Sequence, residues 1–385
     1  MRIGYLHIGS PQHGINRYGR LLAAEARTRS SLNVIEAAVE LTGEQSRDRT
    51  ALNHAAQLLS SADVIHFQHN SSIWGKSRQQ LHNLDAFFDR CSVPLVVTLH
   101  DIFYSPCSKT LAQRYFSNPS TVRFSEFARA LLRDQLSPKI LALHKVIARS
   151  QFAFVCTQEE ARRLSDRVST SNVQIIPHFV ETRTIHFSRE EARKSLNLDN
   201  FIVITVLGFI YSGKGHQLLI RALCDLPENV RVVFAGGVSS GHEAYYQELM
   251  TLAETEGVRD RIHVTGYLSE SELEHYLLAT DLAVCPFRQT SASGSLSTWI
   301  SVARPILASN IPQVAEYNTL APGAIKTFEN YTSDGLKAAI LEFLTADCKY
   351  ENDKIAVLRD QLSMSSVFDQ HLHSYDRLLK LDYVA

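Results

Sequence analysis

The chain has 385 residues, of which 45% are hydrophobic and 21% charged; this is the composition of a soluble globular protein long enough for two domains. No apolar run reaches the roughly 18 to 20 residues of a membrane span, and the N-terminal stretch is too short and too β-like for a signal peptide, so we expect a cytoplasmic protein. The net charge is −1, and we expect no nucleic-acid partner.

The first half alternates short apolar strands with helices. A strand over residues 2–8 ends in the glycine-rich turn 9–14, and a helix over 16–27 follows. This turn lacks the G-x-G-x-x-G spacing, so it does not predict a dinucleotide site. Further strands are expected at 33–39, 64–68, 95–99 and 153–156, and helices at 51–61, 76–89, 124–149 and 158–167. The alternation predicts a parallel, doubly wound sheet.

The second half repeats this alternation after a polar linker at residues 181–200. Strands are expected at 201–207, 230–235, 261–265, 281–285, 305–309 and 324–327. Helices are expected at 214–224, 243–256, 270–279, 294–303, 331–344 and 352–382, the last one broken. We therefore predict an α/β protein of two Rossmann-like domains, 1–182 and 183–363, with a cleft between facing carboxyl edges.

Cysteine and histidine spacing gives no metal site. The six cysteines show no metal-ligand spacing and are interpreted as reduced core residues: Cys91, Cys107, Cys156, Cys224, Cys285 and Cys348. His66 and His69 lie three apart on a strand and point to opposite faces, and His371 and His373 are unsuitably spaced on a helix. We expect no bound metal.

One pair of titratable residues follows a first-half strand. The strand over 95–99 ends in His100 and Asp101, at the carboxyl edge where doubly wound sheets place their active sites. A capping aspartate beside a hydrogen-bonded histidine would give the same pattern. Both interpretations remain open on the residues alone.

Two turns in the second half suit an anion. The turn 208–215 places Lys214 between Gly213 and Gly215, but it is no P-loop, because Gly215 stands where Ser or Thr is required. The turn 291–295 opens a helix, whose first amides lie at the positive end of the helix dipole. An ordinary helix-start turn and a helix cap explain the same residues without a ligand.

Seven segments, in order and at the expected distances, resemble the family 4 retaining glycosyltransferases of GT-B fold. The resemblance covers nearly the whole chain. Its segments are the glycine-rich first turn, VVTLHD at 96–101, IIPHFVE at 175–181, GFIYSGKG at 208–215, FAGG at 234–237, VTGYLSESELEHYLLATDLAVCPF at 264–287 and RPILASNIPQVAE at 304–316. It also implies that a C-terminal helix with Tyr375, at about 364–385, returns to the first domain.

The resemblance implies that the first domain holds the acceptor and the second a nucleoside-diphosphate sugar. Lys214 would neutralise the pyrophosphate, and His100 would contact the donor sugar; these two are the expected catalytic residues. The other expected donor-binding residues are Gly14, Phe209, Gly213, Gly266, Tyr267, Leu268, Thr290, Ser291, Ser293, Gly294, Ser295, Leu296 and Thr298. Asn16, Asp101 and His178 are expected on the acceptor side.

Three positions depart from the family pattern. Two glutamates eight positions apart are replaced by Thr290 and Thr298, and an arginine five before Lys214 is replaced by Phe209. A charge-assisted hydrogen bond is typically worth about 1.5–3 kcal/mol, so each loss would weaken donor binding unless neighbours compensate. A turn like Ser293–Leu296 occurs in family branches that lack the glutamate pair, and we expect activity to survive.

The expected function is a metal-independent, retaining transfer of a hexosyl-type sugar from a nucleoside-diphosphate sugar, without a cofactor, to a glycan or a polyprenyl-diphosphate-linked acceptor. Synthesis of a cell-surface polysaccharide or glycoconjugate is the expected setting. The alternatives are a catalytically silent GT-B protein that stabilises a partner glycosyltransferase, and a GT-B epimerase or phosphorylase. The departures at Phe209, Thr290 and Thr298 favour the silent alternative, whereas His100, Lys214 and the Gly/Ser turn oppose it.

Charge is unevenly distributed along the chain. Residues 1–180 carry 21 Lys/Arg against 14 Asp/Glu, and the remainder 18 against 26. Within 121–150, six basic residues accompany an apolar stripe: Phe124, Phe127, Leu131, Leu132, Ile140, Leu141, Leu143 and Ile147. This pattern predicts weak, peripheral contact with the anionic inner face of the plasma membrane. Two domains with unlike surfaces and a stripe that is simply core would give the same pattern.

Overall fold

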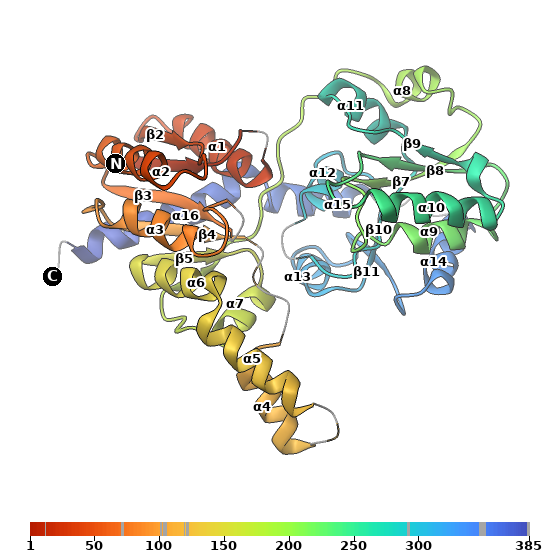
Figure 1. Ribbon diagram of the computed structural model, residues 1–385. Helices are drawn as coiled ribbons and strands as arrows, with labels where there is room; N and C mark the ends of the chain where they lie inside the picture. The colour runs from red at the N-terminus through yellow and green to blue at the C-terminus, as the bar shows by residue number, and fades with distance from the viewer. Residues whose placement is uncertain are drawn as a thin grey trace. The chain divides into compact units, whose positions relative to one another are not determined.

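The chain folds into two α/β units, which a computed structural model describes over residues 1–11, 13–70, 73–100, 102, 106–118, 120, 123–290, 293–345 and 352–382. Unit 1 comprises residues 1–178 and 364–385, and unit 2 comprises residues 179–363. Each unit contains one six-stranded parallel sheet with helices on both of its faces (Figure 1). The predicted α/β class, with two doubly wound parallel sheets, is confirmed.

The strands of unit 1 coincide closely with the apolar runs of the sequence. They are β1 (Arg2–Ile8), β2 (Asn33–Val39), β3 (Val64–His69), β4 (Leu95–Leu99), β5 (Phe152–Val155) and β6 (Val173–Ile175). Their order in the sheet is β2-β1-β3-β4-β5-β6. The order changes direction at β1, and doubly wound sheets bind their ligands outside the carboxyl ends of strands next to such a switch point.

The helices of unit 1 include one from the far end of the chain. They are α1 (Gly14–Arg27), α2 (Gln45–Leu59), α3 (Gln79–Phe88), α4 (Ser108–Ser117), α5 (Phe124–Leu136), α6 (Pro138–Arg149), α7 (Gln158–Ser165) and α16 (Met364–Asp382). The expected helix at about 364–385 therefore belongs to unit 1. Helices α4 and α5 extend away from the sheet of this unit (Figure 1).

The two faces of the unit 1 sheet differ in chemistry. Successive strand residues point to opposite faces, and one set, which includes Leu6, Phe67 and Val97, joins a large aliphatic and aromatic core. The opposite set is buried as well, and it combines polar side chains such as His66 and Thr98 with apolar ones such as Phe154; we call it the polar face. Helix α16 covers this polar face through side chains such as His371 and Tyr375.

The strands of unit 2 form a sheet of the order β12-β11-β10-β7-β8-β9. They are β7 (Ile202–Leu207), β8 (Val230–Ala235), β9 (Ile262–Val264), β10 (Leu282–Cys285), β11 (Ile306–Ser309) and β12 (Lys326–Phe328). In chain order this arrangement is 3-2-1-4-5-6 read from β9, the Rossmann order. Its switch point lies between β7 and β10, and the turns predicted to bind an anion follow these two strands.

The helices of unit 2 cover a separate apolar core on each face of the sheet. They are α8 (Arg189–Ser195), α9 (His216–Leu223), α10 (Glu243–Thr255), the 3-10 helix η2 (Arg259–Arg261), α11 (Glu270–Ala279), α12 (Gly294–Ser301), α13 (Pro312–Leu320), α14 (Ser333–Thr345) and α15 (Asn352–Gln361). Of the five described cysteines, four are buried as expected, but Cys224 is exposed, so its assignment to the core was wrong.

Several expected elements were wrong or missed. The single helix expected at 124–149 is two helices, because Pro138 lacks an amide hydrogen and instead begins α6. Short elements were missed altogether: the edge strand β6 and helices α4, α8 and α13. In the supposed linker 181–200, Ser188 and Glu191 form a reciprocal capping box that starts α8.

Candidate active site

Two loops of unit 2 come together at the switch point. The loop after β7 ends at Gly215, which has φ +82° and lies so close to the loop after β10 that an added Cβ would stand 2.0 Å from the carbonyl oxygen of Pro286. The amide of Arg288 also donates to the carbonyl of Gly213, at 3.2 Å. Only glycine permits both this backbone conformation and this approach, so Gly215 holds Lys214 beside the second loop.

Lys214 is a buried ammonium group that contacts a hydroxyl and an aromatic ring. The residue is only 6% exposed. Its Nζ donates to Oγ of Ser295 at 2.8 Å and lies 4.5 Å from the centre of the Phe287 ring. Within the described part of the chain, no carboxylate forms an ion pair with it. Burial lowers the pKa of Lys214 from 10.5 to about 8, because desolvation disfavours the charged form.

Helix α12 begins directly beside this ammonium group. Ser293 is its N-cap, and the Ser293 hydroxyl accepts from the amide of Leu296 at 3.2 Å. Among the described residues, no acceptor is found for the two preceding amides of the first turn, those of Gly294 and Ser295. Helix-start amides next to a buried ammonium group form a site that attracts an anion.

None of the side chains at the three departures from the family pattern carries a charge. Phe209 is 55% exposed on the loop after β7. Thr298 donates its hydroxyl to the carbonyl of Gly294 at 2.9 Å, and Thr290 is half-buried on the loop after β10. Among the predicted donor-binding residues, Lys214 and the first amides of α12 are therefore the groups that offer positive charge.

The segment expected to line the nucleotide base follows β9. Gly266 has φ +74°, Tyr267 is 83% exposed, and Leu268 is half-buried. This segment approaches the loop after β8: an added Cβ on Gly237 would stand 3.5 Å from the amide of Tyr267. This segment thus presents backbone and an exposed aromatic ring, and its role toward a nucleotide base stays a prediction.

The first-domain candidates gather in unit 1. His100 is 8% exposed at the end of β4, and its Nε2 donates to Oε1 of Gln68 at 2.9 Å. The ring of Tyr18 lies 5.0 Å from those of both His100 and His178. Burial, followed by the nearby charge of His178, lowers the pKa of His100 to about 3. His100 is therefore a neutral imidazole at ordinary pH.

The glycine-rich turn of unit 1 is held by Asn16. Its Nδ2 donates to the carbonyls of Ile8 and Gly9, at 3.3 and 2.7 Å, and its Oδ1 accepts from Arg20 at 2.8 Å. The side chain is thus committed to the fold, and its role toward an acceptor stays a prediction. Gly14 begins α1 in open surroundings. Two other candidates, Asp101 and Ser291, lie outside the described residues.

Two close contacts of the candidates were not anticipated. Phe287 faces the Lys214 ammonium, and Gln68 binds His100 from the neighbouring strand. The sequence contains one signal for Gln68: polar residues alternate within an otherwise apolar strand, in the run His66-Phe67-Gln68-His69. Such alternation marks a buried face that must satisfy hydrogen bonds.

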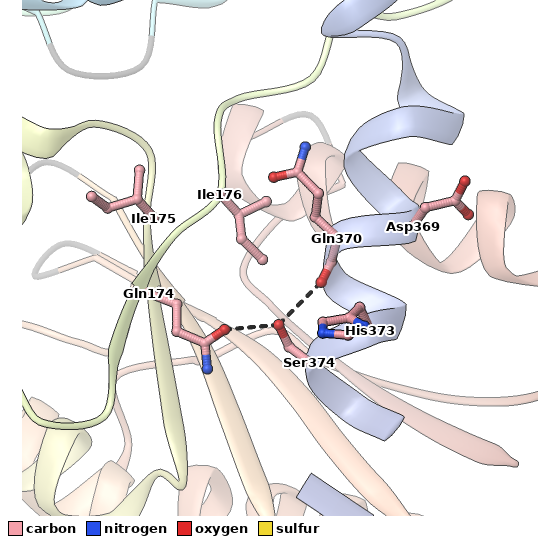
Figure 2. Close-up of a pocket in the computed structure, with 7 residues that line it drawn as sticks. All are labelled: Gln174, Ile175, Ile176, Asp369, Gln370, His373 and Ser374. Carbon is pink, nitrogen blue, oxygen red and sulfur yellow. Dashed lines mark hydrogen bonds between the residues drawn. The ribbon is translucent and has the colours of Figure 1, made fainter. Parts of the chain in front are cut away.

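Possible metal ligands and one surface hollow were also compared with the candidate residues. Among the residues described, no three His, Cys, Asp or Glu side chains are arranged to hold a metal ion. A hollow of about 400 Å³ lies between β6 and α16 in unit 1 (Figure 2), and its lining contains none of the candidate site residues: Gln174, Ile175, Ile176, Asp369, Gln370, His373 and Ser374. None of the helices within the described ranges is long and apolar enough to span a bilayer.

Sequence comparison identifies relatives of unit 2. The family model for glycosyl transferases group 1 matches residues 188–356. The D-inositol 3-phosphate glycosyltransferase of Xylanimonas cellulosilytica is 29% identical over 163 residues, which are 40% of this chain and 39% of that protein. The alpha-D-kanosaminyltransferase of Streptomyces kanamyceticus is 22% identical over 219 residues, 57% of this chain and 53% of that protein. This chain thus spans about two fifths to one half of these relatives.

Structure comparison covers the whole chain. HepE of Anabaena, solved in complex with UDP-glucose, matches with a TM-score of 0.71 at 15% identity, covering 98% of this chain and 100% of that chain. Sucrose-phosphate synthase of Thermosynechococcus elongatus matches with a TM-score of 0.69 at 14% identity, covering 99% and 100%. These similarities show a GT-B fold. The match over residues 188–356 adds that the second half of the chain is similar to the glycosyl transferases group 1 family.

Proposed function

We propose that the protein is a retaining glycosyltransferase that moves a sugar from a nucleoside-diphosphate sugar to a glycan or a lipid-linked acceptor. The observation that carries this proposal is the buried ammonium of Lys214, which contacts a hydroxyl and an aromatic ring and, among the residues that the structure describes, no carboxylate. Burying an unpaired ammonium group is costly, and a bound anion offsets that cost. A diphosphate supplies such an anion.

The chemistry proposed for this site is electrostatic. As the bond between the sugar and the diphosphate breaks, negative charge grows on the leaving phosphate. Lys214 and the first amides of α12 are positioned in advance to stabilise that charge, which is how preorganised donors accelerate a reaction. We propose that they perform the task a metal ion performs elsewhere, so that transfer needs no metal. Retention would follow if a phosphate oxygen of the donor takes the proton of the attacking hydroxyl on the same face.

The acceptor side of the proposal draws on the exposed surface of unit 1. Four large apolar side chains of the hairpin formed by α4 and α5 are more than half exposed: Phe116 (80%), Phe124 (65%), Leu132 (59%) and Leu136 (67%). Phe116 and Phe124 flank Tyr115, whose ring lies 5.7 and 6.3 Å from theirs. An aromatic cluster therefore marks the end of this hairpin.

The stripe predicted over 124–147 divides between two environments. On α6, Ile140, Leu143 and Ile147 are buried, so that part is core, as the alternative interpretation held. On the same helix Leu141 is 41% exposed, and the other exposed side chains of the stripe lie on the hairpin. There five basic residues accompany Glu126 and Asp134: Lys109, Arg114, Arg123, Arg129 and Arg133. Basic charge beside exposed aromatic and leucine side chains suits an anionic bilayer surface.

We therefore propose peripheral contact of this hairpin with the inner face of the plasma membrane. There the protein would meet a polyprenyl-diphosphate-linked acceptor used in cell-surface polysaccharide or glycoconjugate synthesis. The positive charge of the first half supports an anionic partner of this kind.

A ligand panel tests the donor half of the proposal. A nucleoside diphosphate or its sugar, at 100 times its Kd, should stabilise the protein by about 2.7 kcal/mol in a thermal-shift experiment. The stabilising sugar nucleotide should then be consumed in a transfer assay, at a rate that EDTA leaves unchanged. Nucleotide binding without transfer would favour the silent, partner-stabilising protein, and no binding by any nucleotide would refute the donor site.

A further inference from the structure

A line of buried polar side chains runs across the polar face of the unit 1 sheet and ends at His100. Gln68 on β3 is 2% exposed, and its amide oxygen accepts the hydrogen bond from Nε2 of His100 at 2.9 Å. A carbonyl oxygen can only accept, so this contact requires the proton of neutral His100 to be on Nε2. The other ring nitrogen, Nδ1, then carries the lone pair.

The hydrogen bonds of the other side chains in this line determine which end of the Gln68 amide faces His100. Its Nε2 lies 3.5 Å from Nε2 of His66, which also meets the hydroxyl of Thr98 at 2.8 Å. Both neighbours can donate to that nitrogen. His66 then carries its proton on Nδ1 and donates it to the hydroxyl of Tyr375 at 2.6 Å. With these proton positions, each hydrogen bond in the chain of side chains from His100 to Tyr375 has one donor and one acceptor.

The fold also holds Gln68 firmly in place. Its main-chain carbonyl accepts a hydrogen bond from Nε1 of Trp74 at 3.1 Å. Helix α1 packs closely over the side chain at Gly19, where an added Cβ would stand 3.2 Å from Cγ of Gln68. A glutamine confined in this way has little freedom to turn, and it can impose one orientation on the imidazole that it binds.

We propose that Gln68 is a positioning residue for His100: it holds the imidazole with Nδ1 unprotonated, so that His100 offers the donor sugar a hydrogen-bond acceptor. This inference rests on the proposed glycosyltransferase function. It assigns the chemistry of the contact, in which a hydroxyl of the sugar donates to Nδ1. His100 thereby distinguishes a sugar with a hydroxyl at this position from its deoxy analogue.

The substitution Gln68→Glu changes the charge and keeps the shape. A carboxylate beside His100 favours the imidazolium form, whereas in the native protein burial holds the pKa of His100 at about 3. The other titratable groups around His100 remain the same: His13, Tyr18, His66, His69 and His178. The ring of His100 should therefore titrate at least about one pH unit higher in Gln68→Glu than in the native protein.

The test reads the two ring nitrogens of His100 directly, by ¹⁵N NMR of the full chain labelled at histidine, with the signal assigned by its loss in His100→Ala. We expect a protonated Nε2 and an unprotonated Nδ1 in the native protein. In Gln68→Leu this preference should be lost, turnover should fall about tenfold, and KM for the sugar nucleotide should stay within about twofold, because the positioning acts on reaction more than on binding.

Gln80→Leu is the matched control. Gln80 is a fully buried glutamine of the same unit, and it donates to the carbonyl of Ser77 at 2.9 Å, away from His100. Its replacement should leave the His100 signals and KM unchanged. A native His100 protonated on Nδ1 would overturn the proposal, as would an unaltered ring in both Gln68 variants. Because the ring is observed without substrate, this outcome is separate from a failure of the protein to transfer sugar.

Discussion

Nζ of Lys214 donates a hydrogen bond to Oγ of Ser295, 2.8 Å away and 81 positions further along the chain. The bond joins the loop after β7 to the first turn of α12, which follows β10. These two strands are neighbours at the switch point of the unit 2 sheet. Because the ammonium group is held by a neutral hydroxyl, its charge remains available to a ligand.

Replacing Lys214 by methionine should separate stability from binding. Methionine fills a similar volume without a charge, and burying an unpaired ammonium group costs free energy. We therefore expect Lys214→Met to be at least as stable as the native protein without ligand, and to lose at least about tenfold in affinity for a nucleoside diphosphate. Thermal unfolding with and without the nucleotide measures both effects.

The control for this experiment is Lys337→Met. Lys337 lies on α14 and is paired with Asp225 and Asp334, at 2.8 and 3.2 Å. Its loss should leave nucleotide affinity unchanged. Native affinity in Lys214→Met, with normal folding, would remove Lys214 from the proposed phosphate site.

Nucleotide affinity should fall as the pH rises through 8. Burial lowers the pKa of Lys214 to about 8, against 10.5 for an ordinary lysine, and a diphosphate binds the protonated form. Affinity should therefore drop by up to about tenfold per pH unit above pH 8. In Lys214→Arg, whose guanidinium stays charged, this decrease should be absent. Isothermal titration at pH 7, 8 and 9 distinguishes the two behaviours.

The unfolding free energy should depend on pH with the opposite sign. Between about pH 8 and 10.5 the unfolded chain binds the Lys214 proton and the folded protein does not, so the stability of the unliganded protein rises with pH in this window. Below pH 8 the full cost of the buried charge is present. A difference between the native protein and Lys214→Met that does not change from pH 7 to 10 would contradict this account.

His371 should make the protein sensitive to acid. Its ring packs 4.8 Å from that of Phe154 under the polar face of the sheet, and neither ring nitrogen has a hydrogen-bond partner among the described residues. Burial lowers the pKa of His371 to about 3. The stability contributed by the neutral ring is therefore complete above pH 6.5 and is lost as the pH falls from 6.5 towards 3.

The substitution His371→Leu should remove this loss. At pH 5 the native protein should have lost about 2 kcal/mol through this residue, and the variant should retain it. His373, exposed on the same helix, provides the control His373→Leu, which should lose stability in acid as the native protein does. Urea unfolding at pH 7 and pH 5 gives the comparison. Equal losses in all three proteins would contradict the prediction.

The sequence predicted what depends on local pattern. Apolar runs placed the strands, and the turns around Lys214 and Ser293 were expected to bind an anion because each joins a strand to a helix. The pattern was misleading at Pro138. The apolar residues keep their helical spacing on both sides of this proline, although one helix ends before it and another begins at it. Short elements such as α13 have too few residues to show a period.

Contacts between distant segments could not be predicted. His100 and Gln68 are 32 positions apart, and Lys214 and Ser295 are 81 apart. Both contacts depend on the order of the strands in a sheet and on how closely neighbouring loops approach each other. No single sequence motif determines either contact. Asn16 was expected on the acceptor side. In the structure its side chain stabilises the turn after β1 through hydrogen bonds to the carbonyls of Ile8 and Gly9, and it also accepts from Arg20.

The last prediction concerns the hairpin of α4 and α5. Its exposed aromatic residues and basic charge should produce weak, salt-sensitive binding to anionic vesicles, because each Lys or Arg near such a surface contributes about 1 kcal/mol and salt screens it. The double variant Phe116→Ser with Phe124→Ser removes the two exposed phenylalanine side chains of the hairpin and should lower binding at least about fivefold. Leu58→Ser, at a residue 48% exposed on α2, is the matched control and should bind normally. The measurement is cosedimentation with phosphatidylglycerol-containing and neutral vesicles at low and high salt. Equal binding by the double variant would place the contact elsewhere, and no binding of the native protein at low salt would favour a soluble acceptor.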